Sequence, residues 1–251
     1  MLLKTLMWIV WFPSALAAPL AASPQGEAGE VLDRAIETLG GEVWLGVEDV
    51  YAKGRYYQFQ RGQLAGADVF EDYVKFPDKE RTEFGEDGER VRINNGDRGW
   101  NVTDGNVEAQ IPEQVTAFRE EFEVSLDYLL RNVLSGSEIS LQYVGRDTIG
   151  FSRVDVLELR DEDRTRIGLY IDRSSGRILQ KTVRRLSSPQ VHEEIYSNYH
   201  EIDGVLTPLL VTRYTDGVKT MEIRFETVRY NRGMDDGLFL AEVSEEDGDE
   251  D

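Results

Sequence analysis

The two histidines, His192 and His200, are the side chains of this 251-residue sequence best suited to proton transfer or metal binding near neutral pH. Both fall in a stretch with strand-like alternation, where their spacing corresponds to about 26 Å of extended chain at roughly 3.3 Å per residue. One metal ion cannot join side chains so far apart. The neighbouring Glu194 and Asn198 predict that this face is exposed to solvent. We therefore expect no metal site here.

Other catalytic signals are weak. The sequence contains no G-x-S-x-G, no H-E-x-x-H, no P-loop and no dinucleotide-binding fingerprint. It has no cysteine, which excludes disulfides, thiol nucleophiles, cysteine-ligated zinc and lipid attachment through an N-terminal cysteine. Its 48 acidic residues are too many for any one carboxylate pair to be informative. We expect no catalytic residues and no cofactor.

The net charge of −20 excludes a typical nucleic-acid-binding protein, whose affinity comes mostly from basic contacts to phosphate. Part of the charge lies in a run of acidic residues near the end of the chain. Because like charges repel, residues 244–251 are expected to form a disordered acidic tail.

The first residues have the pattern of a secretory signal peptide. Lys4 supplies a positive charge, Leu6 to Phe12 are apolar, and Ala15-Leu16-Ala17 fits a cleavage site. The apolar run is shorter than the roughly 20 residues needed to span a bilayer. We predict a signal peptide over residues 1–17, a linker over 18–29, and a protein exported to the periplasm with no transmembrane segment in its mature chain.

The elements that must position any site are mostly strands. From about Val50 to Tyr230 the sequence alternates apolar and polar residues between short turns such as Asp104-Gly105 and Asp216-Gly217. We count about ten or eleven strands, and open sheets of that size curl or close. The prediction is a mainly β protein with some α structure: a curved antiparallel sheet forming an incomplete barrel.

Two segments have helical spacing instead. Glu30 to Leu39 forms a short helix that Gly40-Gly41 ends, and Pro112 to Leu134 carries a long apolar stripe. We expect the second segment to be one helix that covers the concave face of the sheet.

The stripe and two tryptophans are the candidates for lining an apolar cavity. Plain core packing and a ligand-facing surface both explain them, and the residues alone do not decide between the two. Burying an acyl chain yields about 0.8 kcal/mol per CH₂, so lipid could bind without any specific polar contact. The candidate cavity residues are Trp44, Trp100, Val115, Phe118, Phe122, Leu126, Leu129 and Leu130.

A basic stretch interrupts the acidic chain. Arg177, Lys181, Arg184 and Arg185 fall within nine residues of one another. Cross-strand pairing with glutamates on neighbouring strands explains them most simply. The alternative is contact with an anionic lipid headgroup or with a partner protein.

The order of motifs resembles the LolA/LolB-type lipoprotein carrier superfamily, in its branch similar to outer-membrane lipoprotein-sorting proteins. The similarity covers residues 30–243 and is carried by the following segments: Leu39-Gly40-Gly41, Tyr73-Val74-Lys75-Phe76-Pro77, Asn95-Gly96-Asp97-Arg98-Gly99-Trp100 and Leu169-Tyr170-Ile171-Asp172-Arg173-Ser174-Ser175-Gly176. The resemblance implies an eleven-stranded incomplete barrel with helices over an apolar cavity for acyl chains. In the carrier, an arginine immediately before the proline holds the lid closed. Phe76 occupies that position here and is a candidate gate residue.

Three functions remain open from the sequence. The first is a periplasmic carrier that binds lipid or the acyl chains of lipoproteins in an apolar cavity, for lipoprotein sorting in the cell envelope. The second is a sensor or scaffold module of the same fold that binds another envelope protein. The third and least favoured is a hydrolase that uses carboxylates in the cavity.

Overall fold

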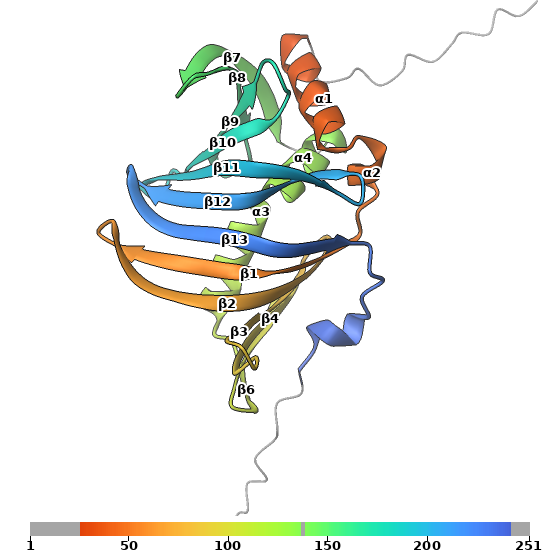
Figure 1. Ribbon diagram of the computed structural model, residues 1–251, viewed down its shortest axis with the longest axis vertical. Coiled ribbons are helices and arrows are strands. Elements are labelled where there is room, and N and C mark those ends of the chain that lie inside the picture. The colour runs from red at the N-terminus through yellow and green to blue at the C-terminus, as the bar shows by residue number, and fades with distance from the viewer. Residues whose placement is uncertain (1–25, 137–138, 242–251) are drawn as a thin grey trace, which may run out of the picture.

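A single curved antiparallel sheet forms most of the molecule in the computed structural model, which describes residues 26–136 and 139–241 (Figure 1). The predicted signal peptide, the predicted linker as far as residue 25 and the predicted acidic tail lie outside the described residues. Where they are described, the thirteen strands are joined in one sheet that does not close. The mainly β, incomplete-barrel prediction is confirmed, with thirteen strands rather than about eleven.

The strands follow the sequence as two meanders. Their bounds are β1 Asp49–Gln60, β2 Gln63–Lys75, β3 Lys79–Phe84, β4 Arg90–Asn95, β5 Arg98–Thr103, β6 Asn106–Ala109, β7 Ser140–Ile149, β8 Ser152–Arg160, β9 Arg166–Asp172, β10 Ile178–Arg184, β11 Val191–Ile202, β12 Val205–Thr215 and β13 Val218–Tyr230. Their spatial order is β6-β5-β4-β3-β2-β1-β13-β12-β11-β10-β9-β8-β7. The first meander runs from the middle of the sheet to one edge, and the second runs from the other edge back to the middle. Pairing of β1 with β13 joins them.

This topology explains why a helical segment crosses the sheet. Strands β6 and β7 lie at opposite edges, so the chain between them must pass over one face. The segment contains two helices, α3 (Pro112–Glu123) and α4 (Leu126–Leu134), which cross the strands on the concave side in Figure 1. The single helix predicted from Pro112 to Leu134 is therefore wrong in one respect. Ser125 starts a new helix, because its side chain accepts a hydrogen bond from the Tyr128 amide and caps α4.

Three further helices complete the fold: α1 (Glu27–Leu39), α2 (Glu42–Leu45) and the short 3-10 helix η1 (Asp236–Phe239). Helix α1 begins at Glu27, three residues before the predicted start. Its apolar residues recur at helical spacing, so one face can be buried against the sheet. Gly40, at a φ of 130°, ends the helix as predicted.

The main core lies between the concave face of the sheet and helices α1 and α4. The sheet contributes fully buried leucines and isoleucines from β8, β9 and β10. The helices contribute Leu32 from α1 and Leu129 and Leu130 from α4, all at most 1% exposed. Burial on this scale, at about 25 cal/mol per Å² of apolar surface, is what holds this half of the molecule together. The buried sheet residues are Leu157, Leu159, Ile167, Leu169, Ile171 and Ile178.

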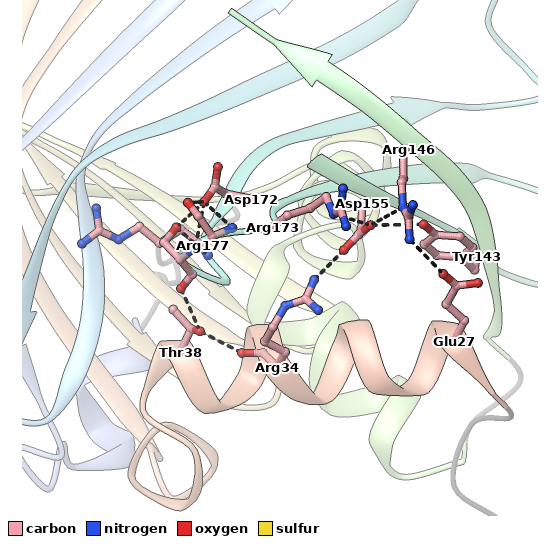
Figure 2. A network of polar contacts seen from close by, with 11 residues as sticks. Glu27, Arg34, Thr38, Tyr143, Arg146, Asp155, Asp172, Arg173 and Arg177 are labelled. Atoms are coloured by element: carbon pink, nitrogen blue, oxygen red, sulfur yellow. Dashed lines mark hydrogen bonds and ion pairs between the residues drawn. The ribbon is translucent and has the colours of Figure 1, made fainter. Parts of the chain in front are cut away.

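Polar contacts fix α1 onto the sheet at the same end (Figure 2). The buried carboxylate of Asp155 lies 2.7 Å from the Arg34 guanidinium of α1, and it also faces Arg146 and Arg173 at 3.8 and 3.5 Å. Thr38 of α1 donates to the Ser175 carbonyl in the β9–β10 turn. A buried charge is costly unless it is paired, and these three arginines neutralise the Asp155 carboxylate at the edge of the core.

A second, smaller core lies on the convex face. Trp100 and Ile93 are neighbours in the β4–β5 register, and they pack with Met234 and Phe239 from the C-terminal segment. The carboxylate of Asp49 accepts hydrogen bonds from three successive amides, those of Arg232, Gly233 and Met234. These contacts hold the C-terminal segment on the outside of the sheet, opposite α3.

Candidate functional site: a cavity beneath helix α3

A cavity of about 910 Å³ lies between α3 and the concave face formed by β1 to β5 and β10 to β13. That volume is at the upper end of the roughly 300–1,000 Å³ typical of small-molecule sites. The cavity exists because α3 packs less closely than α4 does. Phe122 is the only residue of α3 that is buried, whereas α4 buries three of its nine residues.

Aromatic side chains form the apolar end of the cavity, where α3 meets α4 and β2. The ring of Phe122 lies 5.6 Å from that of Phe118 and 6.3 Å from that of Phe76, measured between centroids. Apolar residues of the neighbouring strands continue this surface. The apolar lining includes Leu39, Trp44, Val50, Phe70, Val74, Phe76, Phe118, Phe122, Leu126, Val205, Val211, Ile223 and Phe225.

Of the eight cavity residues predicted from the sequence, the structure brings four together here: Trp44, Phe118, Phe122 and Leu126. Leu129 and Leu130 instead belong to the main core, so they do not line the cavity. Val115 borders a separate hollow of about 390 Å³ near the start of α3. Trp100 borders the same hollow and packs in the convex core, because Asn101, its neighbour in β5, is the residue that faces the larger cavity.

Phe76, the candidate gate residue, has an aromatic ring in contact with an arginine from the covering segment. The Arg131 guanidinium of α4 lies between two rings, 4.8 Å from the centroid of Phe76 and 4.7 Å from that of Trp44. It also donates to the carbonyl oxygens of Trp44 and Leu45, at 2.7 Å each. Burial lowers the pKa of Arg131, opposed by the charge of Asp127. Phe76, at the position where the related carrier has an arginine, thus contacts an arginine of α4 through a cation–π interaction.

A buried ionic cluster holds the C-terminal end of α3. The Lys181 ammonium, 3% exposed as a residue, lies 2.8 Å from Glu194 and donates to the Val124 carbonyl between the two helices. Arg213 bridges Glu194, at 2.9 Å, and Glu121 of α3, at 2.7 Å. Desolvation alone would raise the pKa of Glu194, but Lys181 and Arg213 outweigh it and hold the pKa at about 2.

A second polar cluster lies across the cavity on β2, β3 and β4. The Thr82 hydroxyl lies 3.0 Å from a carboxyl oxygen of Asp72 and 3.1 Å from one of Glu80. Arg92 contacts the same Glu80 oxygen at 3.3 Å. Burial and the neighbouring Glu80 charge raise the pKa of Asp72 to about 8, so its carboxyl group is mostly protonated at neutral pH.

The predicted basic residues do not form one surface. Lys181 pairs with Glu194 inside the molecule, as cross-strand pairing predicts, and Arg185 donates to the Glu120 carbonyl of α3. Arg177 lies 5.5 Å from the ring of Tyr199, and Arg184 is exposed on β10 opposite Val191. Two of the four therefore fix α3 and its junction with α4 to the sheet.

The histidine face differs from the prediction. His200 is exposed and bonds Asn198, and His192 lies near Thr215. Glu194, predicted to be exposed with them, instead faces the cavity. Among the described residues, no group of three or more histidines, aspartates and glutamates is arranged to hold a metal ion.

Comparison with solved structures places this architecture among known folds. A LolA superfamily protein from Nitrosomonas europaea matches with a TM-score of 0.59 and 12% identity, over 85% of this chain and 97% of that one. A putative outer membrane lipoprotein-sorting protein domain from Vibrio parahaemolyticus matches with a TM-score of 0.58 and 14% identity, over 84% and 94%. The protein has the LolA-superfamily fold.

A DUF1329 family protein from Desulfovibrio piger is similar to the same extent, with a TM-score of 0.56 and 14% identity over 87% of this chain and 98% of that one. A scan against protein-family models gives no match for the sequence, and a search of curated proteins gives none either. At such low identities the LolA-like likeness is one of fold. Within the described residues, no helix is long and apolar enough to cross a membrane.

Sequence reasoning predicted that Lys181 pairs with a glutamate on a neighbouring strand, but it did not predict that this pair and the Asp72 cluster face the cavity. Glu194, Arg213 and Asp72 are charged residues on alternating strands, and such residues normally face solvent. Only the curvature of the sheet and the crossing of α3 turn their face inward. One signal was available: Lys181, Glu194 and Arg213 occupy neighbouring positions on consecutive antiparallel strands, which predicts cross-strand ion pairs whichever face they share.

Proposed function

We propose that this protein is a non-enzymatic carrier in the periplasm that binds lipid, or the acyl chains of lipoproteins, in the cavity beneath α3. The cavity of about 910 Å³ with its aromatic and aliphatic lining is the observation that carries the proposal. The LolA-superfamily fold is consistent with it. The export signal predicted over residues 1–17 supports the periplasmic location.

The energetics favour hydrocarbon as the ligand. A chain that places roughly ten methylenes in the cavity gains about 8 kcal/mol from burial, before the costs of immobilisation. The rings of Phe76, Phe118 and Phe122 are positioned to contact such a chain. Because this driving force is not directional, no catalytic or strictly conserved polar motif is required.

Helix α3 acts in this proposal as the movable cover. It is attached to the sheet by a few polar contacts, from Arg213 to Glu121 and from Arg185 to the Glu120 carbonyl. Helix α4, with Leu129 and Leu130 in the core, stays in place when α3 moves. The break at Ser125 allows the two helices to move independently.

A cavity-filling variant tests the proposal. Ile223 lies on β13 in the middle of the apolar lining, and Ile223→Trp places a larger side chain there. We expect the purified wild-type protein to bind a fluorescent fatty-acyl probe, and the variant to bind it at least about tenfold more weakly. The matched control is Leu64→Trp, at a residue that is 62% exposed. A wild-type protein that binds no acyl probe, or equal binding by Ile223→Trp, contradicts the carrier function.

A second candidate function rests on a different observation. Phe151 is fully exposed at the tip of the β7–β8 hairpin, next to an edge strand with no further partner in the sheet. The unpaired edge of β7 is a template on which another protein chain can add, and Phe151 lies beside it. If the protein is a module that binds an envelope partner, Phe151→Ser abolishes cross-linking to that partner and leaves acyl-probe binding unchanged.

A further inference from the structure

The cavity beneath α3 is not uniformly apolar. Toward the apolar end its lining is buried, as Trp44 and Val211 are, with exposures of 4% and 8%. Toward β3 and β4 it is lined by polar side chains and becomes accessible to solvent, and the Arg92 side chain is 48% exposed. A ligand that fills the whole cavity therefore meets hydrocarbon at one end and hydrogen-bonding groups at the other. The polar lining at the open end consists of Asp72, Glu80, Thr82, Arg90, Arg92, Asn101, Gln110 and Gln114.

The hydrogen bonding of this open end determines its charge. The hydroxyl of Thr82, a residue 6% exposed, lies within hydrogen-bonding distance of both Asp72 and Glu80. The Thr82 hydroxyl is the donor in both contacts, so the two carboxyls share its single hydrogen. Burial and the Glu80 charge raise the pKa of Asp72, whereas Glu80 has Arg92 as its partner, so Asp72 is the carboxyl that is neutral. The polar contacts therefore connect the neutral Asp72 through Thr82 to Glu80. Arg92, at 3.3 Å, balances the charge of Glu80.

A cluster of this kind discriminates between headgroups. An anionic headgroup such as phosphate would contact Arg92 but would also lie against the Glu80 carboxylate, whose charge repels it. A quaternary ammonium cannot donate a hydrogen bond and would face the guanidinium groups of Arg90 and Arg92. A neutral hydroxyl both donates and accepts, so it can pair with the carboxyl of Asp72, the hydroxyl of Thr82 and the amide of Asn101 without introducing a net charge.

We propose that the cavity takes an amphipathic ligand with a neutral, hydroxyl-bearing headgroup, such as a sugar or glycerol group, which binds among Asp72, Thr82, Glu80 and Arg92 while the hydrocarbon extends toward Phe122 and Trp44. This inference rests on the proposed function, because it assigns the ligand class of the same cavity. It adds that one end of the ligand is recognised by directional hydrogen bonds.

Three probes with the same twelve-carbon chain test the headgroup class: dodecyl maltoside, dodecyl phosphate and dodecyltrimethylammonium. Each is titrated below its micelle concentration against a bound fluorescent fatty-acyl probe. We expect dodecyl maltoside to bind at least about tenfold more tightly than either charged probe, because only the neutral headgroup pairs with these polar groups without placing a charge against Glu80 or the arginines.

Thr82→Val removes the central hydroxyl at nearly constant volume. It is expected to lower the affinity for dodecyl maltoside about tenfold and to leave that for dodecyl phosphate unchanged. The matched control is Thr212→Val on β12, because Thr212 is absent from the cavity lining, which includes its neighbours Val211 and Arg213. Asp72→Asn keeps a neutral polar group at that position, so it is expected to retain the wild-type preference for maltoside. This second variant keeps the test valid if Thr82→Val fails to fold.

The outcomes separate the two proposals. Failure of all three twelve-carbon probes and of the fatty-acyl probe to bind contradicts the carrier function itself. Equal binding of the three probes leaves the carrier function standing and overturns the headgroup assignment. Tightest binding of dodecyl phosphate also overturns it, since the attraction of the arginines would then exceed the repulsion of Glu80.

Discussion

The two halves of the concave face use the same sheet in different ways. Over β8 to β10, helices α1 and α4 fill the curvature, and leucines and isoleucines of three strands are fully buried. Over β13 and β1 to β5, α3 crosses the sheet above a cavity of about 910 Å³, which extends to β10. We call the first region the packed half, because side chains fill it, and the second the hollow half, because it encloses the cavity.

This difference begins within one connecting segment. The residues before Ser125 form α3, which buries only Phe122, and those after it form α4, which buries Leu129, Leu130 and Val133. Native interiors are close-packed, so the side chains of α4 cannot be removed without loss. On α3, Phe118 and Phe122 border the cavity instead. The core contacts of the crossing segment are therefore made by α4, and the proposed binding surface belongs to α3.

The largest expected effect is in the packed half. Leu130→Ala leaves a void in a core where the residue is 0% exposed, so the free energy of unfolding should fall by about 3–4 kcal/mol. Urea denaturation measures the change. A loss below about 1 kcal/mol would mean that the packed half is as loose as the hollow one.

Glu194 lies between the two halves, and its removal has the next largest effect. Glu194→Gln leaves the buried Lys181 and the partly exposed Arg213 without their shared carboxylate, which should cost about 3 kcal/mol. The pKa of Glu194 is about 2 in the folded state, below its ordinary value of 4.5. Because the folded-state pKa is lowered, the stabilisation is complete above pH 4.5 and is lost as the pH falls toward 2.

Unfolding midpoints of wild type and Glu194→Gln should therefore converge between pH 4.5 and 2. A constant difference across that range would show that the ion pairs contribute nothing and that the effect comes from packing.

The β9–β10 turn that fixes α1 gives a smaller effect. The Asp172 carboxylate accepts hydrogen bonds from the amides and hydroxyls of Ser174 and Ser175, and these contacts outweigh desolvation and lower its pKa to about 2. Asp172→Asn should reduce the free energy of unfolding by about 1–2 kcal/mol at pH 7, and the difference should fade as the pH falls from 3.8 toward 2. The control is Asp161→Asn. The wild-type Asp161 carboxylate accepts a hydrogen bond from a single amide, that of Thr165, so a smaller loss of stability is expected.

The smallest effect on stability is expected in the hollow half. Phe118 of α3 is only partly buried, so Phe118→Ala should change the free energy of unfolding by less than about 1 kcal/mol. The same change should weaken fatty-acyl probe binding about tenfold, because the ring lines the cavity. A stability loss as large as that of Leu130→Ala, with binding unchanged, would assign α3 to the core.

The sequence predicts the architecture well, because alternation and turn residues are local signals. The hairpin at Asp104-Gly105, for example, forms where the turn residues place it. The covering segment was also predictable, but its break was not, since the apolar stripe continues past Ser125 without interruption. The site was only partly predictable. A strand pattern does not say which face becomes the inside of a curved sheet, so Trp100 was assigned to the cavity and Glu194 and Asp72 were not.

The helix break at Ser125 has a consequence for how such a protein can diverge. Substitutions in α3 alter the cavity but leave the α4 core contacts intact, so a lineage can change the shape of the cavity without first losing its ability to fold. Substitutions in α4 have no such freedom. Mutational tolerance should therefore change abruptly at one residue in the middle of the crossing segment.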